Sequence, residues 1–368
     1  MDAVLHRPYI RRPMRYIGNK TRLLGFIGRV LDRRRIGRGC AVDPFTGTAS
    51  VARELKHRGF SVIASDIMEY GHIFGRAYVQ VARPPTSPRL AEALGLADGR
   101  IETVVAYLNT VPGERGFIHE HYTPAGEQGA AHGRMYFTPA NGARIDAIRS
   151  RIAHWRAAGW VGEDAHCILL AALLEAADRV ANTTGVYAAF VKSWQSNARR
   201  PLMLRVPALV PGNGCHSKRA DALDAVRDAD AFDLLYLDPP YNTRQYAGYY
   251  HIPELIARGW FNGPVETRGK TGLLADADLR SDWSRARHCE AAFEALIAIA
   301  RCKHIVMSYN AEGIISEPTI KRVLQSYGRR GTYRRYRHTY KRYRSDSDGA
   351  RRCYRGDTVD EYLYCVDR

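Results

Sequence analysis

The 368-residue sequence lacks the cysteine and histidine patterns of metal-binding and disulfide-bonded proteins. Its seven cysteines include no CxxC pair, and its thirteen histidines form no HExxH motif or Cys/His cluster. Zinc sites need such spacings, and disulfide frameworks of small secreted domains usually use an even number of cysteines. We therefore expect reduced thiols, no bound metal and a cytoplasmic location.

Long apolar runs are also missing. Residues 1–13 carry charge but not the apolar core of a signal peptide. The most apolar segment, residues 168–174, is too short to span a bilayer and runs into Glu175 and Asp178. We expect this segment to be a core helix and the protein to have no membrane partner.

Acidic residues are scarce relative to basic ones. The chain has 38 Asp and Glu residues against 55 Lys and Arg residues, which gives a net charge of +17. Such an excess favours a polyanionic partner, although basic proteins also exist for solubility alone. With 45% hydrophobic residues the chain can still bury a sizeable core.

One uninterrupted apolar segment organises the chain. Residues 233–237 lack helical periodicity and lead directly into Asp238, Pro239, Pro240 and Tyr241. Such a run is typical of a strand buried on both faces, and the prolines prevent its extension. Ligands bind at the carboxyl ends of strands in open α/β sheets. The segment therefore predicts a site with a carboxylate, a rigid carbonyl-bearing backbone and an aromatic ring.

A second pattern, near the N-terminus, predicts a nucleoside site. Residues 40–43 read as a strand, residues 51–56 as a helix that ends before Gly59, and residues 60–64 as a second strand followed by Asp66. An acid about 20 residues beyond a glycine-containing first turn has the spacing that binds ribose hydroxyls. The turn has neither GxGxxG nor GK[ST], so it does not predict a dinucleotide or ATP site.

The segment from Tyr16 to Lys20 precedes a predicted amphipathic helix over residues 21–34. A lysine at a helix start opposes the helix dipole. This small cost is understandable if an anion lies beside Lys20, whereas a solvated lysine is the simpler interpretation of the segment alone.

Taken in order, these three segments resemble the Dam-like, alpha-order N6-adenine-specific DNA methyltransferases. That family has a Tyr/Trp-x-Gly-x-Lys segment, a D-x-F-x-G-x-G turn, a target-recognition insert and a D-P-P-Y strand end, in that order. Ala49 replaces the second turn glycine, which puts the turn and the cofactor affinity in question.

The resemblance implies an α/β fold, namely a Rossmann-like methyltransferase sheet with an inserted, mainly helical target-recognition subdomain. Its catalytic domain would comprise residues 1–82 and 212–368, and the insert residues 83–211. We expect the insert to contain mixed helices and Gly-rich loops up to about residue 142, with residues 113–142 in flexible, polar surroundings, and then helices over residues 143–160 and 164–181.

The resemblance also implies roles for individual residues, with S-adenosyl-L-methionine as the methyl donor. Asp238 and the Pro239 carbonyl would hold the amine of a flipped-out adenine, and Tyr241 would stack on its ring. The cofactor-binding residues implied are Tyr16, Lys20, Asp43, Phe45, Gly47, Asp66, Asp221 and Asp238. For Asp221, a helix cap is an equally good interpretation.

Two basic, aromatic segments favour duplex DNA as the partner. Residues 186–201 and 329–355 interleave Tyr, Phe or Trp with Arg, Lys and Asn, as contacts with bases and phosphates require. The second segment predicts a β-hairpin with a basic face, a turn near residues 345–349 and a closing strand over residues 362–366.

Three alternatives remain at this point. An N4-cytosine DNA methyltransferase more often has Ser in place of Asp238, and enzymes acting on RNA or protein glutamine usually have Asn. A non-catalytic DNA-binding protein on a methyltransferase scaffold is supported only by Ala49. The DNA sequence recognised, the oligomeric state (a monomer is plausible), a nucleoid-associated location and a separate cognate restriction endonuclease also stay open.

Overall fold

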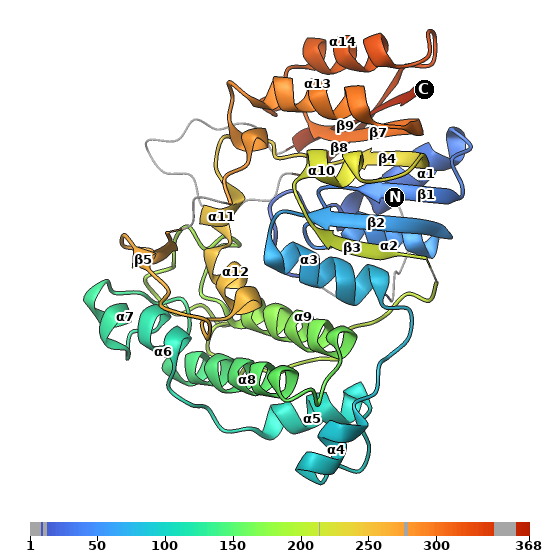
Figure 1. The fold of residues 1–368 in the computed structure, drawn as a ribbon. Helices are drawn as coiled ribbons and strands as arrows, with labels where there is room; N and C mark the ends of the chain where they lie inside the picture. Colours follow the sequence, from blue (N-terminus) through green and yellow to red (C-terminus); the bar gives the residue numbers. More distant parts are fainter. Residues whose placement is uncertain (1–8, 10–12, 213, 276–278, 342–357) are drawn as a thin grey trace.

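The computed structural model describes residue 9 and residues 13–212, 214–275, 279–341 and 358–368 (Figure 1). Seven strands form one sheet in the order β3-β2-β1-β4-β7-β9-β8. β3, β2, β1, β4 and β7 are mutually parallel, whereas β9 is antiparallel to both neighbours. The bounds are β1 (Gly39–Asp43), β2 (Phe60–Asp66), β3 (His216–Arg219), β4 (Phe232–Leu237), β7 (Cys302–Asn310), β8 (Arg334–Lys341) and β9 (Thr358–Asp367).

Helices cover both faces of this sheet. Leu234 and Tyr236 of β4 pack with the helices of one face, and Leu235 and Leu237 with those of the other. The strand predicted from residues 233–237 is therefore buried on both sides, as expected for a central parallel strand. The first face carries α1 (Leu24–Arg33), α2 (Ser50–His57) and α3 (Glu69–Gly75), and the second α10 (Ala222–Arg227), α13 (Cys289–Ile299) and α14 (Glu317–Tyr327).

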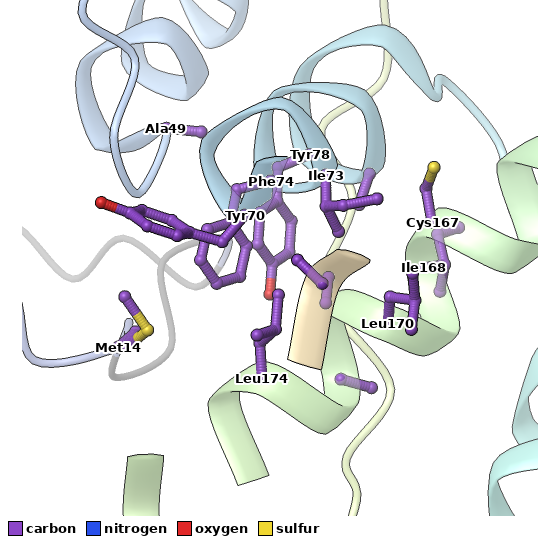
Figure 2. Close-up of a cluster of buried hydrophobic side chains, with 14 of the residues drawn as sticks. Met14, Ala49, Tyr70, Ile73, Phe74, Tyr78, Cys167, Ile168, Leu170 and Leu174 are labelled. Atoms are coloured by element: carbon purple, nitrogen blue, oxygen red, sulfur yellow. The ribbon is translucent and has the colours of Figure 1, made fainter. Parts of the chain in front are cut away.

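A helical region lies between β2 and β3 in the chain. After the π-helical turn η2 (Arg76–Gln80) come α4 (Pro88–Leu94), α5 (Ile101–Thr110), α6 (Phe117–Tyr122), α7 (Glu127–Ala131), α8 (Pro139–Ala157) and α9 (Glu163–Val180). Figure 2 shows Phe74 and Tyr78, from α3 and η2, beside Leu170 and Leu174 of α9. All four side chains belong to one hydrophobic cluster, which joins this region to the first face of the sheet.

Two expectations about this region are wrong. The surroundings of residues 113–142 are not polar throughout, because this segment, which forms α6, α7 and the start of α8, buries Tyr122, Tyr136 and Phe137 completely. Tyr187, expected among residues that contact DNA, is also buried, and its carbonyl accepts a hydrogen bond of 2.6 Å from the Tyr136 hydroxyl. Tyrosines whose hydroxyls find main-chain partners pack in a core as readily as they stack on bases.

The predicted closing strand over residues 362–366 is confirmed as part of β9, whereas the hairpin expected within residues 329–355 is described only for its first strand, β8. β8 pairs with β9 in antiparallel register, and β9 also pairs with β7, so β9 lies inside the sheet. The turn expected near residues 345–349 falls outside the described residues. The remaining elements are η1 (Thr21–Leu23), α11 (Tyr246–Tyr249), α12 (His251–Arg258), β5 (Thr267–Arg268), β6 (Leu273–Leu274) and η3 (Asp282–Ser284). Within the described residues no helix is long and apolar enough to cross a membrane.

Candidate active site

A cavity that opens to solvent, with about 920 Å³ of empty space when the open mouth is included, lies where the strand order reverses, between β1 and β4. The carboxyl ends of β1, β2 and β4 meet at this point, which is where open α/β sheets bind ligands. Every site residue predicted from the sequence lines this one cavity: Tyr16, Lys20, Asp43, Phe45, Gly47, Asp66, Asp221, Asp238, Pro239 and Tyr241. Segments far apart in the sequence therefore contribute to a single site.

The turn after β1 brings the main chain close to Tyr16. Gly47 has φ +52°, and a Cβ atom there would lie 3.0 Å from Tyr16 Cε1. Both the dihedral angle and the close approach favour glycine.

Ala49, in place of the second glycine, also adopts a left-handed conformation, with φ +59°. Its side chain is fully buried and belongs to the hydrophobic cluster of the first sheet face (Figure 2). The turn is thus preserved with alanine, at the cost of backbone strain.

Asp66, at the end of β2, uses its carboxylate to hold this turn. Its Oδ2 accepts from the Gly47 amide at 2.8 Å, and its Oδ1 accepts from the Met68 amide at 2.9 Å. Burial raises the pKa of Asp66 to about 6, against the lowering effect of these amides. Each oxygen retains a second lone pair, so the carboxylate can still accept a ribose hydroxyl.

Asp43, at the end of β1, is buried and has a strongly perturbed acidity. Burial, and next the charge of Asp238, raise the pKa of Asp43 to about 8. The Phe45 amide donates to its Oδ1 at 3.3 Å, and the Phe45 ring packs edge-on against Trp283. A buried acid with so perturbed a pKa is typical of a functional site.

Asp221 caps a helix at the edge of the cavity. Its side chain caps α10 by accepting from the Leu223 amide at 2.8 Å, and the residue also lines the cavity. The helix cap is a direct observation, whereas cofactor binding by Asp221 stays a prediction.

Lys20 is buried among carboxylates. Its Nζ lies 2.8 Å from Asp238 Oδ1 and 3.3 Å from Glu361 Oε1, and it donates to the Gly18 carbonyl at 3.0 Å. The anion beside Lys20 is thus part of the protein, and the lysine is not solvated: its exposure is 3%. Its attraction to Asp238 opposes the effect of burial, which still raises the pKa of Asp238 above the ordinary value.

The Tyr241 hydroxyl lies between the same two carboxylates. It is 2.6 Å from Asp238 Oδ1 and 2.9 Å from Glu361 Oε1, and Lys20 Nζ donates to it. The Tyr241 ring meets Tyr309 edge-on, and Lys20 Nζ lies 4.5 Å from the ring centroid. The polar end of Tyr241 therefore belongs to one buried cluster with Lys20, Asp238 and Glu361, which we call the Lys20 cluster. The sequence did not predict this contact.

Glu361, on β9, is the residue that sequence reasoning missed. It lies one strand beyond β7 and is 1% exposed. Its signal in the sequence is positional, because Val359, Leu363 and Cys365 are buried on the same alternating face of the strand. An acid in such an apolar row indicates a buried functional carboxylate.

Two hydrogen-bond acceptors at the end of β4 remain unused. Among the described residues, none donates to Asp238 Oδ2 or to the Pro239 carbonyl, and the Asp238 side chain keeps 17% exposure. The next carbonyl, that of Pro240, accepts from the Tyr309 hydroxyl at 3.3 Å. Tyr309 thereby fixes the loop while Asp238 Oδ2 and the Pro239 oxygen can accept from a ligand.

Comparison with known proteins agrees with this geometry. Residues 16–267 match the family described as D12 class N6 adenine-specific DNA methyltransferase. The matched segment includes β1, β2, β4 and the whole helical region. The chain belongs to this family. Because the family is adenine-specific, the N4-cytosine alternative is set aside, and DNA is the substrate of this methyltransferase.

Relatives of this methyltransferase match nearly its full length. The type II methyltransferase M.NlaIII of Neisseria lactamica is 32% identical over 96% of this chain and 99% of its own. M.CviAII of Paramecium bursaria Chlorella virus 1, also a type II methyltransferase, is 27% identical over 95% and 97%. The type II methyltransferase M.FokI of Planomicrobium okeanokoites is 33% identical over 90% of this chain but only 50% of its own.

Proposed function

We propose that this methyltransferase uses S-adenosyl-L-methionine to methylate the N6 of an adenine flipped out of duplex DNA. The observation that carries the proposal is the pair of unused acceptors, Asp238 Oδ2 and the Pro239 carbonyl, at the wall of an acidic cavity. An exocyclic amine has two hydrogens to donate, and these two acceptors match them.

The charge of the cavity suits this cofactor. Four carboxylates line it, from Asp43, Asp66, Asp221 and Asp238, against Lys20 as the lining cation among the described residues. The raised pKa values of Asp43 and Asp66 reflect burial, which a bound cation would offset. When bound, S-adenosyl-L-methionine supplies an electrophilic methyl carbon on a positively charged sulfur.

The residues around the cavity have distinct roles toward that cofactor. Asp66 accepts the ribose hydroxyls, and Phe45 and Gly47 line the cofactor surface, where Gly47 leaves room for the main chain to approach. Tyr16 closes the pocket from the N-terminal segment, with its ring stacked on Tyr250 at 4.6 Å between centroids. Lys20, Asp43 and Asp221 complete the lining.

Asp238 and Pro239 prepare the amine for attack. The nitrogen lone pair of adenine N6 is delocalised into the ring, so the amine is a poor nucleophile until its hydrogens are held out of the ring plane. Asp238 Oδ2 would accept one hydrogen and the Pro239 carbonyl the other, so that the nitrogen lone pair is free for the methyl group. As the N–C bond forms, the C–S bond of S-adenosyl-L-methionine would break and S-adenosyl-L-homocysteine would leave. The proton that the methylated nitrogen must lose passes to Asp238 and then to solvent.

The flipped adenine needs aromatic surfaces and the DNA needs basic ones. Tyr241, together with Tyr246 in the same cavity, supplies rings for stacking, which offsets part of the cost of unpairing the base. Residues 83–211 serve as the target-recognition subdomain, and the exposed arginines of β8 contact phosphates. The enzyme acts as a monomer on nucleoid DNA in the cytoplasm, beside a separate restriction endonuclease.

Nucleoside analysis tests the reaction. The purified protein is incubated with duplex DNA of varied sequence and methyl-labelled S-adenosyl-L-methionine, and the DNA is digested to nucleosides. The expected product is N6-methyl-2′-deoxyadenosine; N4-methyl-2′-deoxycytidine, or no incorporation of label, would contradict the proposal.

Substitution of Asp238 separates catalysis from binding. Asp238→Ala removes the proposed acceptor and is expected to lower turnover at least about 100-fold, the effect of losing one preorganised hydrogen-bond partner at a reacting centre. DNA affinity should change less than about threefold, since specific DNA contacts lie elsewhere. Near-normal turnover by this variant would disprove the assigned role of Asp238.

A further inference from the structure

Glu361 is a buried carboxylate whose two oxygens have very different surroundings. Its Oε1 accepts from the Ser308 hydroxyl at 2.7 Å and contacts Lys20 and Tyr241, whereas its buried Oε2 has no hydrogen-bond partner in the described part of the chain. An unpaired oxygen of a buried carboxylate destabilises the fold. Residues kept at such a cost are concentrated at functional sites.

Glu361 shares two of its donors, Lys20 and Tyr241, with Asp238. Lys20 Nζ lies 2.8 Å from Asp238 Oδ1 and 3.3 Å from Glu361 Oε1. The Tyr241 hydroxyl, with a single hydrogen, lies within bonding distance of both carboxylates. A hydrogen bond that Lys20 or Tyr241 donates to Glu361 is therefore not donated to Asp238.

We propose that Glu361 is a positioning residue for methyl transfer, which draws Lys20 and Tyr241 partly away from Asp238 so that Asp238 stays a strong acceptor for the adenine amine. The inference rests on the proposed role of Asp238 and extends it to a strand beyond the 16–267 segment matched to the family. Glu361 acts through Lys20, Tyr241 and Asp238 and does not itself contact the base.

The electrostatic effect has a definite sign. The negative charge of Glu361 raises the pKa of Asp238, while Lys20 lowers it. Removal of the Glu361 charge therefore lowers the pKa of Asp238 and weakens its oxygen as a proton acceptor. The other titratable groups that affect or are affected by Asp238 are Lys20, Asp43, Tyr236, Tyr241, Tyr246 and Tyr309.

The test compares Glu361→Gln with the unmodified enzyme, with label transfer to DNA as the assay. We expect kcat to fall by roughly 10-fold to 100-fold, a part of what a proton-accepting group contributes to a reaction. The KM values for DNA and for S-adenosyl-L-methionine should change less than about threefold, because the residue contacts neither. The acid limb of the kcat–pH profile should move to lower pH, in line with the lower pKa of Asp238.

Asp360→Asn is the matched control. It removes a carboxylate from the neighbouring position of β9, where Asp360 forms an ion pair of 3.1 Å with the exposed Arg337 on the opposite face. Since such surface pairs contribute little, we expect unchanged kcat and an unchanged pH profile.

Glu361→Asp distinguishes charge from packing. It keeps the negative charge on a shorter side chain, so the acid limb should stay near its original position while kcat falls less than in Glu361→Gln. If Glu361→Gln does not fold, as judged by its thermal transition, Glu361→Asp becomes the test. An acid limb that moves to lower pH although the negative charge is kept would then contradict the role of that charge.

The outcomes separate this inference from the proposed function. Unchanged kcat in a folded Glu361→Gln would overturn the positioning role. So would a fall in kcat that is as large in Glu361→Asp as in Glu361→Gln, with no shift of the acid limb in either variant. Failure of the unmodified enzyme to methylate adenine would instead refute the proposed function.

Discussion

Substitution of Lys20 by methionine tests whether the buried cluster is held together by charge. Methionine has a similar length and fills the same space, but it leaves Asp238 and Glu361 without the cation between them. Lys20 is 3% exposed, so water cannot take over the role of the ammonium group.

The expected loss of stability is large. Removal of one partner from a buried ion pair costs about 3–5 kcal/mol, because the remaining charge stays buried without compensation. We take about 4 kcal/mol at pH 8 for Lys20→Met. The loss should shrink as the pH falls: without Lys20 the pKa of Asp238 rises further, and a carboxyl group that takes up a proton in the folded state no longer carries the uncompensated charge.

Urea unfolding, followed by circular dichroism at pH 8 and pH 5.5, measures this effect. Lys218→Met is the control, since Lys218 forms an ion pair of 3.4 Å with Asp228 in which both side chains are largely exposed. It should cost less than about 1 kcal/mol. The double variant Lys20→Met/Glu361→Gln should be more stable than the sum of its single variants implies, with a coupling of about 1–3 kcal/mol.

Two results would refute the reasoning. A loss below about 1 kcal/mol for Lys20→Met would mean that the carboxylates find other compensation. Additive effects in the double variant would mean that Lys20 and Glu361 do not interact across their 3.3 Å separation.

Three further predictions concern the turn after β1 and the acid at its start. Gly47→Ala combines φ +52° with a Cβ atom 3.0 Å from Tyr16, and should lower the affinity for S-adenosyl-L-methionine at least about tenfold in calorimetry, given about 1–2 kcal/mol of backbone strain. Ala49→Gly relieves similar strain but loses a buried methyl group worth about 0.8 kcal/mol and adds backbone entropy to the unfolded chain. Its unfolding free energy and cofactor affinity should therefore stay within about 1 kcal/mol of the original, and a larger change in the urea midpoint would show that the turn depends on alanine. Because the pKa of Asp43 is raised to about 8, this group makes the cofactor-free protein less stable as the pH rises from about 4 toward 8. Asp43→Asn should flatten that part of the curve of thermal stability against pH, and an unchanged slope would contradict the assignment.

The sequence predicted the parts of the site that lie in short contiguous motifs. Asp43, Asp66 and Asp238 each end a strand, and parallel strands bring their carboxyl ends to one edge, so the motifs alone placed them together. Their detailed hydrogen bonding was not predictable in this way. Both Asp66 oxygens accept hydrogen bonds from main-chain amides of nearby turns. No residue pattern in the sequence predicts these hydrogen bonds.

What the sequence did not predict depends on long-range contacts. Glu361 meets Tyr241 across 120 positions, and only the pairing of β9 with β7 brings the two together. The DNA contact expected of Tyr187 was misread because stacking on bases and packing in a core call for the same side chains. Tyr187 differs from a DNA-contacting tyrosine only in its burial.

The position of β9 has a consequence for how activity arises during synthesis. This strand follows β7 and β8 in the chain, yet it lies between them and supplies Glu361. β8 has no partner in the described sheet other than β9, so neither β8 nor the Lys20 cluster can be completed before the chain beyond residue 357 is made. A shortened translation product that ends before β9 would hold the motifs of 16–267 without the finished cluster. The fold thus delays full assembly of its reactive centre until nearly the entire described chain has emerged.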